Sequence, residues 1–448
     1  MRRTALLAAS GAALLALVAA GLAMGKPDWY GNLPRENMQG YVLAACLAGA
    51  AYAAAVALAR RGPIRHGLPL VLAVAAALRL LTFASPPLLS TDIFRYVWDG
   101  RVQAAGINPY LYLPVAPELA ALRDAGSGWG AIFEHINRAD TAPTIYPPAA
   151  QALFALIGLA WSSIWGVKAA MLALDGLAIA AALLLLRAAR QPGQLVLIYA
   201  WNPLPVCEFA GAGHIDAAAT ALAALALLAA VRRRPAWAGA ALGVAVLFKL
   251  LPAALFPAIW RRWDWRTPAF AAAVIVAGYA AYAGAGWRLL GYLPGYADEE
   301  GVGGHGAFLL RLAAELGPLP RWAGPAYAAS GLAVLLLLAA WVALRAPLPE
   351  DAAARARLIC RDALLLGTAT MVVLSPHYPW YLAGLALPAV LAPAWSVLWL
   401  TIAAPVLYLD DWHDKVIWPC LVFVPFAVLL TLELRRAALH PALDAKGS

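Results

Sequence analysis

The feature that most constrains this chain is a series of apolar runs about twenty residues long, because a helix of ~20 residues crosses the ~30 Å hydrocarbon core of a bilayer. Of the 448 residues, 63% are hydrophobic and 13% are charged, whereas soluble domains average ~45–50% apolar and ~25% charged residues. A soluble fold could not cover so much apolar surface. We therefore predict an all-α, polytopic transmembrane helical bundle, and we exclude a soluble enzyme, a disordered chain and a nucleic-acid-binding domain.

We predict about 12–14 membrane segments within a single integral membrane domain, residues 1–448. The candidate spans are 5–24, 41–59, 68–84, 167–188, 194–209, 214–231, 236–262, 267–284, 325–344, 358–374, 378–393, 395–409 and 416–434. The net charge of +9 comes from basic residues that gather at the ends of these runs. If the N-terminus is cytoplasmic, most of the arginine clusters also fall on the cytoplasmic side, as the positive-inside rule requires. The C-terminus then lies inside as well.

Two apolar stretches do not fit a simple alternation of spans. Counting 147–163 as a crossing would place Arg187 and Arg190 outside, so we expect this stretch to lie against the outer leaflet. The stretch 236–262 must return to the side that it leaves, and Pro252, which lacks a backbone donor, favours a broken hairpin near Lys249. Irregular backbone at membrane depth is tolerated where it lines a protein or aqueous cavity. The break is therefore a candidate site.

The longest polar stretch lies between the third and fourth candidate spans. We interpret 85–166 as an extracytoplasmic loop with juxtamembrane helices, and 285–324 as a second extracytoplasmic loop. Loops of such length usually carry function. Within the first loop, the sequence predicts a helix over 91–105 and a turn near Asn108.

On the predicted helix, Asp92, Arg95, Tyr96 and Asp99 share one face, because they are three, four and seven positions apart. The two carboxylates would lie about 10 Å apart at 1.5 Å rise per residue. That exceeds the ~5 Å separation of a double-displacement glycosidase pair, so Asp92, at the helix start, is the better candidate base. The alternative is structural: Asp92 caps the helix, and Asp99 pairs with Arg95 or Arg101.

A second polar cluster contains Glu208, His214 and Asp216 around a Gly-Ala-Gly turn. An ionisable group near the membrane is a functional candidate by default, and glycine lets the backbone approach a ligand closely. His214 and Asp216 resemble metal ligands, but two side chains without a third do not predict a metal site. The alternative is a tight turn with polar residues at the membrane interface.

Two further basic residues are candidates. Lys249 lies in an apolar stretch, where a charge must be paired or hydrated, so it either pairs within the bundle or holds a phosphate. His377 lies between two prolines and precedes Tyr378 and Tyr381. This pattern suits an interfacial aromatic belt or a rigid site that offers His377 to an anion. All these features fall on the extracytoplasmic side of the predicted topology, which favours an active site there.

The chain resembles the bacterial GT-C membrane glycosyltransferases, and more narrowly the polyprenyl-phosphate-mannose-dependent mannosyltransferases and their glycosyltransferase 87-like relatives. The resemblance covers about residues 85–390 and rests on a series of motifs in the expected order. They are 92–110 (DIFRYVWDGRVQAAGINPY), 146–148 (YPP), 201–203 (WNP), 213–216 (GHID), 248–252 (FKLLP) and 375–381 (SPHYPWY).

The resemblance implies an inverting hexosyltransferase of the bacterial cytoplasmic membrane. It would move a hexose, with mannose favoured, from a polyprenyl-phosphate donor to a lipid-linked or envelope glycan acceptor at the outer face. The family role of general base maps onto Asp92, and the candidates for the donor phosphate are Lys249, His377 and Arg101. Because the leaving phosphate is already anionic, no general acid is needed and cationic side chains can replace a metal. We therefore expect no cofactor and no metal.

The remaining expected partners are membrane lipids, with no nucleic acid. The candidate substrate-binding residues are Arg95, Asp99, Asn108, Tyr146, Glu208, His214, Asp216, Tyr378 and Tyr381. The alternative function is a transporter or flippase of a lipid-linked glycan. Such proteins often show repeats and paired broken helices in two halves, whereas this sequence shows one predicted broken hairpin and no visible repeat. A non-catalytic assembly subunit is a further alternative, against which the polar 85–146 stretch argues.

Overall fold

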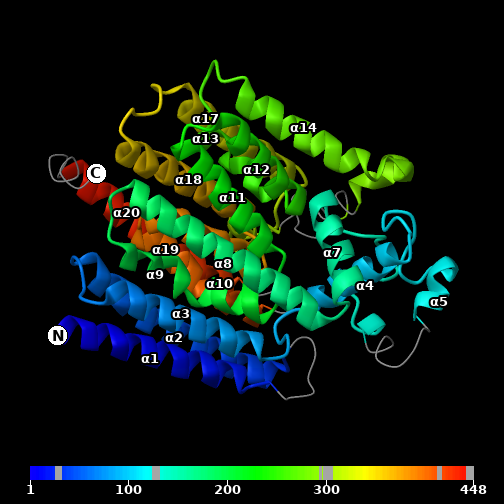
Figure 1. The fold of residues 1–448 in the computed structure, drawn as a ribbon, viewed down its shortest axis with the longest axis horizontal. Coiled ribbons are helices and arrows are strands. Elements are labelled where there is room, and N and C mark those ends of the chain that lie inside the picture. Colours follow the sequence, from blue (N-terminus) through cyan, green and yellow to red (C-terminus); the bar gives the residue numbers. More distant parts are fainter. Residues whose placement is uncertain (26–32, 124–131, 292–294, 296–305, 411–415, 440–448) are drawn as a thin grey trace.

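The computed structural model describes residues 1–25, 33–123, 132–291, 295, 306–410 and 416–439. Within these ranges every regular element is helical (Figure 1), which confirms the predicted all-α polytopic fold. Parts of both predicted polar loops, residues 124–131, 292–294 and 296–305, lie outside the described residues.

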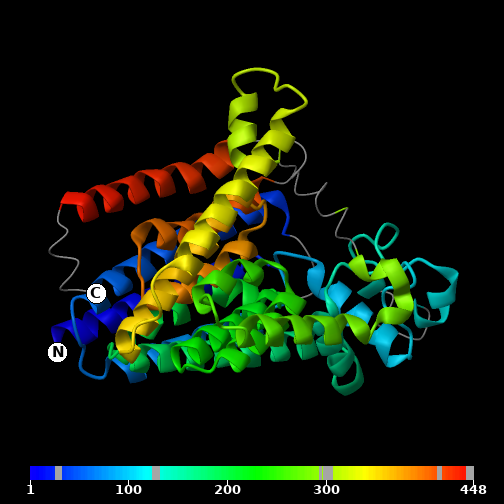
Figure 2. The ribbon, with the colours of Figure 1, turned by 90° about the horizontal axis from the view of Figure 1, so that it is seen from above.

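Most helices of the bundle run roughly along one common direction (Figure 1), whereas Figure 2 shows the yellow α17 (Ala323–Leu344) inclined to the others. The longer helices are α1 (Arg2–Leu22), α2 (Arg35–Arg60), α3 (Gly67–Phe83), α8 (Ile164–Ala188), α11 (Asp216–Val231), α12 (Pro235–Phe248), α14 (Arg266–Ala280), α17, α18 (Ala352–Leu374), α19 (Trp395–Ala403) and α20 (Ile417–Leu439). Short helices connect or cover them: α4 (Asp92–Ala104), α5 (Ala120–Arg123), α7 (Pro148–Ala160), α9 (Leu197–Ala200), α10 (Pro203–Pro205), α13 (Phe256–Ile259) and α16 (Phe308–Ala314). Figure 2 shows α20 along the outer side of the bundle.

By length and composition, five described helices can cross a membrane, namely α1, α2, α8, α17 and α20. The number rises to seven if each of two bent pairs is one span. One pair joins Pro203–Gly211 to α11 at 119°, and the other joins α14 to Ala283–Leu290 at 111°. Other apolar segments are helices of 10–17 residues, such as α3 and α12. The chain is thus a multi-pass membrane protein in which many of the predicted spans are short or bent.

The predicted break near Lys249 is present. Helix α12 ends at Phe248, and Lys249 is extended at φ −156° and ψ 140°. A 3₁₀ helix, Leu251–Leu255, and α13 then bring the chain back, and Ile259 lines a pocket together with Arg234, which precedes α12. The hairpin therefore returns to the end from which it started.

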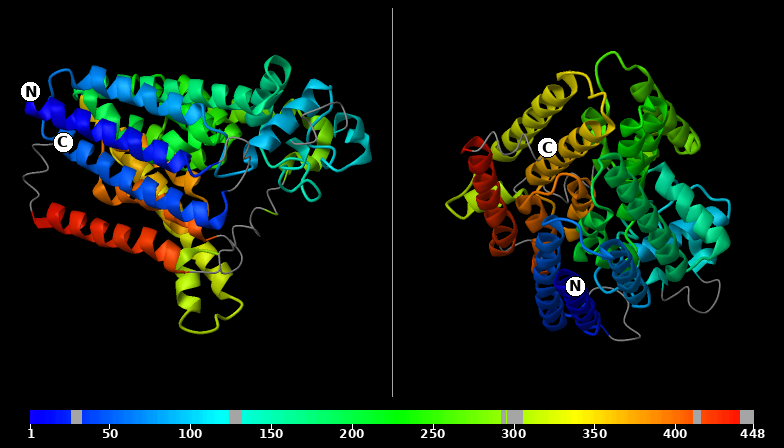
Figure 3. Two further views of the ribbon diagram at one scale, coloured as in Figure 1. Left: turned by 90° about the horizontal axis from the view of Figure 1, so that it is seen from below. Right: turned by 60° about the vertical axis from the view of Figure 1, so that its left-hand side comes forward.

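Helices α4 and α7 form a unit at one end of the bundle, opposite the start of α1 (Figure 3, left). The predicted helix over 91–105 is α4, and α7 lies across the bundle direction beside it (Figure 1). A Cβ atom at Gly100 would lie 2.3 Å from the carbonyl oxygen of Phe154, and one at Gly158 would lie 2.3 Å from the carbonyl oxygen of Gly100. Glycine at both positions permits this close crossing.

A buried ion pair joins the helices behind this unit. Nε of Arg79 on α3 lies 2.6 Å from Oδ2 of Asp175 on α8, and both side chains are buried. The hydroxyl of Tyr199 donates to Oδ1 of the same carboxylate at 2.6 Å, and Arg79 Nη1 donates to the carbonyl of Ala200 at 2.6 Å. The ion pair thus joins α3 to α8 and offsets the cost of two intramembrane charges.

Candidate active site

A cavity of about 380 Å³ lies where the bundle meets the α4–α7 unit. Its walls come from α4, the 145–147 segment, the start of α11, the break after α12, and the 374–381 segment. The polar and aromatic residues that line it are Asp92, Tyr96, Tyr110, Tyr146, Asp216, Lys249, Tyr279, Trp380 and Tyr381. Segments from five of the sequence motifs therefore meet at one place.

Asp92 stands at the first position of α4, on the wall of the cavity. Nδ2 of Asn137 donates to its Oδ1 at 2.6 Å, and the Asp92 backbone N–H donates to Ser90 Oγ at 3.1 Å. The helix has no side-chain cap, so the capping alternative for Asp92 is wrong.

Burial raises the pKa of the Asp92 carboxyl above its ordinary value, and nearby Asp216 adds to this increase. The positive charge of Arg138, the hydrogen bond from Asn137 and the charge of Lys249 oppose the increase in pKa. Because basicity rises with pKa, these surroundings favour a carboxylate that accepts protons more readily than an exposed one.

Lys249 lines the same cavity as Asp92, at the break after α12, and it is paired. Its Nζ donates to Asp216 at 2.7 Å and 3.0 Å, to Oδ1 and Oδ2 respectively. The same ammonium lies 3.7 Å from the centroid of the Tyr381 ring. A carboxylate and an aromatic face together offset the cost of holding a cation at membrane depth.

Aromatic side chains make up much of the cavity wall. The rings of Tyr96 and Tyr146 pack edge to face with centroids 4.9 Å apart, and the Tyr110 hydroxyl donates to the carbonyl of Tyr146 at 2.8 Å. The Tyr96 hydroxyl accepts from the N–H of Ile215 at 3.5 Å. These contacts join α4 to the turn before α11. They produce a largely pre-formed pocket with a few polar groups, as is typical of small-molecule sites.

A narrower apolar groove of about 90 Å³ adjoins the cavity. The two spaces share Asp216, Lys249, Leu251 and Tyr381. From this shared polar point the groove extends between α11, α18 and the 3₁₀ helices of 379–390, lined by Ala219, Ala223, Leu227, Leu255, Met371 and Leu385. A ligand with an anionic head and an apolar chain matches this combination.

Arg95 and Asp99 do not line the cavity. Both are fully buried, and Arg95 Nε lies 3.0 Å from Asp99 Oδ1. Arg95 Nη2 donates to the carbonyls of residues 142 and 143, while Asp99 Oδ2 accepts from Thr144 Oγ1 at 2.6 Å and Gln151 Nε2 at 2.9 Å. Asp99 therefore pairs with Arg95, as the structural alternative predicted, and the pair lies in the protein interior and not on a solvent-exposed face. The two residues attach α4 to the 142–151 segment.

Asn108 and Arg101 also lie away from the cavity lining. Asn108 Oδ1 accepts from the N–H of Tyr110 at 3.1 Å, and its Nδ2 donates to the carbonyl of Tyr282 at 3.4 Å. Asn108 therefore shapes the turn that presents Tyr110. Arg101 lies toward the opposite end of α4 from Asp92, so the geometry does not support its assignment to a donor phosphate in this cavity.

Glu208 and His214 are buried behind the cavity wall. The Tyr408 hydroxyl donates to Glu208 Oε1 at 2.8 Å, and His214 Nε2 lies 3.9 Å from Glu208 Oε2. The His214 ring packs edge-on against Trp380 with centroids 4.2 Å apart. Neither residue lines the cavity, whereas Trp380, against which His214 packs, does. The two residues therefore support the cavity wall from behind.

His377 faces a different space. Its Nε2 lies 3.0 Å from the carbonyl oxygen of Gly306, and it lines a small pocket with Arg311 and Asp410. Tyr378 stacks on Trp380 with centroids 4.6 Å apart and likewise does not line the main cavity. The geometry therefore does not support the expected role of His377 at a donor phosphate, because the residues of this segment that line the cavity are Leu374, Pro376, Trp380 and Tyr381.

Several lining or supporting residues were not among those selected from the sequence: Tyr96, Tyr110, Asn137, Arg138, Tyr279 and Trp380. Tyr96, Tyr110 and Trp380 lie inside the quoted motifs, so their place in these motifs could have identified them as candidate site residues. Asn137 and Arg138 lie in a stretch without periodicity, and Tyr279 lies in an apolar helix. Nothing in the sequence distinguishes these three.

In the described part of the chain, no group of three His, Cys, Asp or Glu residues is placed to hold a metal ion. The expectation that no metal takes part stays a prediction. A family model described as glycosyltransferase family 87 matches residues 144–376, slightly more than half of the chain. No curated protein and no solved structure matches the sequence. The matched range contains Asp216 and Lys249 but begins after Asp92.

Proposed function

Because the chain belongs to glycosyltransferase family 87, we propose that it is an inverting hexosyltransferase that uses a polyprenyl-phosphate sugar. The sugar is a hexose, with mannose as the first candidate, and the acceptor is a hydroxyl group of a lipid-linked or envelope glycan. One observation carries the proposal. A single cavity combines a partly buried carboxylate, Asp92, with an ammonium group, Lys249, at the mouth of an apolar groove.

The donor is assigned to the side of the cavity that joins the groove. Its phosphate would lie beside Lys249, whose ammonium has a third donor besides those directed at the two Asp216 oxygens. The prenyl chain would extend along the groove between α11 and α18. Burial of each methylene contributes about 0.8 kcal/mol, so the groove supplies binding energy while the phosphate fixes the position of the sugar.

The acceptor is assigned to the side of Asp92. The Asp92 carboxylate accepts the proton of the acceptor hydroxyl as its oxygen attacks the anomeric carbon of the sugar. The bond between that carbon and the phosphate oxygen breaks, and its electron pair leaves with the phosphate. Lys249 stabilises the charge that develops there. A single displacement of this kind inverts the anomeric centre, and it requires neither a general acid nor a metal.

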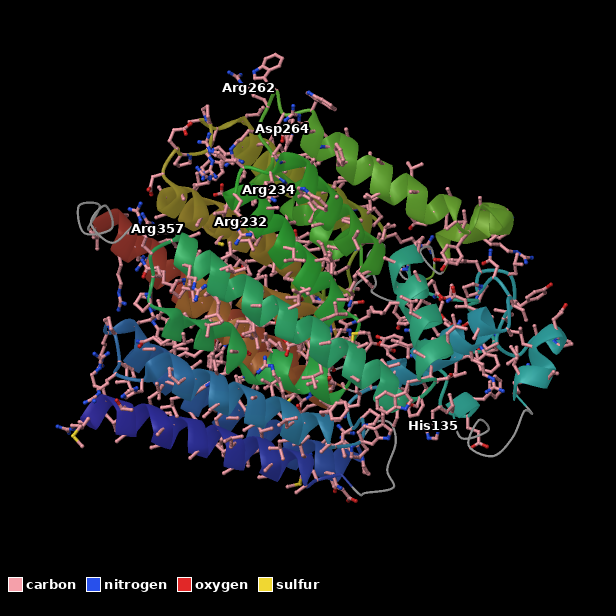
Figure 4. The ribbon with its side chains drawn as sticks, in the orientation of Figure 1. His135, Arg232, Arg234, Arg262, Asp264 and Arg357 are labelled. Carbon is pink, nitrogen blue, oxygen red and sulfur yellow. The ribbon has the colours of Figure 1, made fainter. Side chains whose placement is uncertain are left out.

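The orientation in the membrane is also part of the proposal. Arginine residues gather at the end of the bundle opposite the cavity, as Figure 4 shows for Arg232, Arg234, Arg262 and Arg357. Under the positive-inside rule that end is cytoplasmic. The termini are then cytoplasmic, and the cavity opens at the outer face of a bacterial cytoplasmic membrane. A donor lipid would approach it from the outer leaflet.

The test is sugar transfer by purified protein in lipid vesicles that contain labelled polyprenyl-phosphate mannose and a membrane glycan extract as acceptor. We expect the wild-type protein to form a new glycosidic product and Asp92→Asn to be slower by about 10²–10⁴-fold, the range for a general base. Asp140→Asn, an exposed carboxylate on the same loop, is the matched control and should keep wild-type turnover. Undiminished transfer by Asp92→Asn would remove this residue from the role of base.

A further inference from the structure

The end of the bundle remote from the cavity holds a second large pocket, of about 520 Å³. We call it the arginine pocket, and we define it by its lining residues Arg233, Arg234, Arg261, Trp263, Trp265 and Arg266. They come from the residues before α12, from the connection between α13 and α14, and from Arg266 at the start of α14. Figure 4 shows the labelled Arg232, Arg234, Arg262 and Arg357 at this end, while His135 lies at the opposite end.

Positive charge in the arginine pocket exceeds negative charge. Of the two carboxylates in its lining, Glu350 pairs with Arg233 at 2.7 Å. Oδ1 of the other, Asp264, accepts the backbone N–H groups of Arg266 at 3.0 Å and Thr267 at 3.3 Å. Among the described residues, Arg234 and Arg266 form no ion pair. Two guanidinium groups thus remain for an anion, and their planar fork matches phosphate geometry.

The arginine pocket also contains a buried hydrogen-bond donor, Nε of Arg261. The side chain of Arg261 is 10% exposed, and its Nη2 lies 3.4 Å from Oδ2 of Asp362, outside the pocket lining. Its Nη1 donates to the carbonyls of Pro257 at 2.9 Å and Trp260 at 2.7 Å. Its Nε is buried and has no hydrogen-bond partner in the described structure. An unsatisfied buried donor is unfavourable, and an anionic oxygen bound in the pocket is a suitable acceptor.

Two tryptophans that line the arginine pocket are largely exposed. Trp263 is 88% exposed and Trp265 is 67% exposed, and tryptophan is enriched at membrane–water interfaces. Trp263 also has φ +75°, a strained conformation for a bulky residue. The structure therefore maintains a strained loop that presents an indole ring outward beside a cluster of guanidinium groups. A pocket for a soluble anion would not require these exposed rings.

We propose that the arginine pocket binds the phosphate of an anionic phospholipid headgroup, in the leaflet opposite the one that faces the cavity. Arg234 and Arg266 hold the phosphate, and Trp263 and Trp265 lie among the neighbouring headgroups. Basic pockets between membrane helices are a recognised way to bind such lipids. The pocket lies at the base of the hairpin formed by α12 and α13, whose tip carries Lys249. The bound lipid would thus stabilise the base of that hairpin.

The experiment measures binding of phosphatidylglycerol by the full-length protein in phosphatidylcholine nanodiscs, using native mass spectrometry over a range of lipid fractions. We expect R234Q/R266Q to bind phosphatidylglycerol about tenfold more weakly than the wild type, since each basic residue near the surface contributes appreciably to anionic-lipid affinity. The control R435Q/R436Q removes two exposed charges from α20 and should bind like the wild type. Melting temperatures of all three proteins establish that each is folded.

Three outcomes would overturn the proposal. Equal affinity in the wild type and R234Q/R266Q would show that the pocket does not select the lipid. An equal loss in the control would show that only overall surface charge matters. Saturable binding of labelled inorganic phosphate in pure phosphatidylcholine nanodiscs, abolished in R234Q/R266Q and unaffected by phosphatidylglycerol, would assign the pocket to a soluble anion.

Discussion

Lys249 and Asp216 form an ion pair of 2.7 Å on the wall of the main cavity, at the point where the apolar groove begins. The lysine comes from the break of a hairpin and the aspartate from the first residue of α11. Both residues are separated from Asp92 by more than a hundred positions in the chain, yet all three face one space. The ion pair therefore stabilises the Lys249 cation at membrane depth and keeps it on the cavity wall.

Replacing the lysine tests this arrangement. We expect Lys249→Gln to lower kcat/KM for a polyprenyl-phosphate sugar by about 10²–10³-fold, the range for loss of one electrostatic stabiliser of a developing charge. Lys249→Arg keeps the charge and should retain more activity than Lys249→Gln. Steady-state kinetics with varied donor measure the effect. Equal activity of Lys249→Gln and the wild type would contradict a role at the phosphate.

The surroundings of Asp92 predict a pH dependence. Because burial raises the pKa of Asp92, the acidic limb of the kcat/KM profile should lie above the ordinary carboxyl range of about 4. Asn137→Ala removes a hydrogen bond that lowers this pKa, so the acidic limb should move to still higher pH. Asn37→Ala, whose amide donates to the carbonyl of Met24 outside the cavity lining, is the control. A limb that does not move in Asn137→Ala would contradict the assignment.

The raised pKa of Asp92 also predicts how the stability of the folded protein changes with pH. The folded protein binds the Asp92 proton more tightly than the unfolded chain, since its folded-state pKa is the higher one. The contribution of Asp92 to stability is therefore greatest below the unfolded-state pKa and falls as the pH rises through the raised value. Asp92→Asn should abolish this part of the pH dependence of the melting temperature. An unchanged dependence in the variant would assign it to other groups.

The buried pair of Arg79 and Asp175 predicts a strong effect on stability. Arg79→Leu leaves the Asp175 carboxylate buried without its partner, and breaking a buried pair in this way typically costs about 3–5 kcal/mol. The double variant Arg79→Leu with Asp175→Leu removes both charges and should recover much of the loss. Thermal unfolding in detergent measures the series. A double variant no more stable than Arg79→Leu would show that the charges do not act as a pair.

The crossing of α4 and α7 predicts a steric effect. Gly100→Ala places a Cβ 2.3 Å from the carbonyl oxygen of Phe154, so the helices must separate, at a cost of about 1–3 kcal/mol. Gly176→Ala on α8 is the control, because nothing lies within 4 Å of its added Cβ and alanine favours a helix. Melting temperatures should fall in the first variant and stay or rise in the second. The reverse order would contradict the crossing.

The sequence predicts those features of the structure that depend on residues close together in the chain. The run lengths predict the membrane fold, Pro252 predicts the hairpin, and the helix at Asp92 follows from spacing. Pairing of Arg79 with a partner follows from the cost of an intramembrane charge. The bent spans were not predicted, because a π-helical turn at Val206–Gly211 depends on neighbouring helices and not on apolar run length.

Side-chain direction was the least predictable property of the site. His377 and Tyr381 lie in one motif, yet only Tyr381 faces the cavity, because the chain passes from α18 into a 3₁₀ helix between them. Arg95 and Asp92 share a helix face by spacing, but packing of the 142–151 segment covers Arg95. Periodicity gives the face of a helix, whereas the element that covers that face comes from distant parts of the chain.

The proposed mechanism requires Asp92 to act where the bond between the acceptor oxygen and the anomeric carbon forms, and Lys249 to act where the bond to the phosphate oxygen breaks. Structure determination of the protein with a bound, non-hydrolysable polyprenyl-phosphonate sugar tests this directly. We predict the phosphonate within hydrogen-bonding distance of Lys249 Nζ, the prenyl chain between α11 and α18, and the anomeric carbon facing Asp92. A phosphonate bound at His377 or Arg101, with Asp92 remote from the sugar, would contradict it.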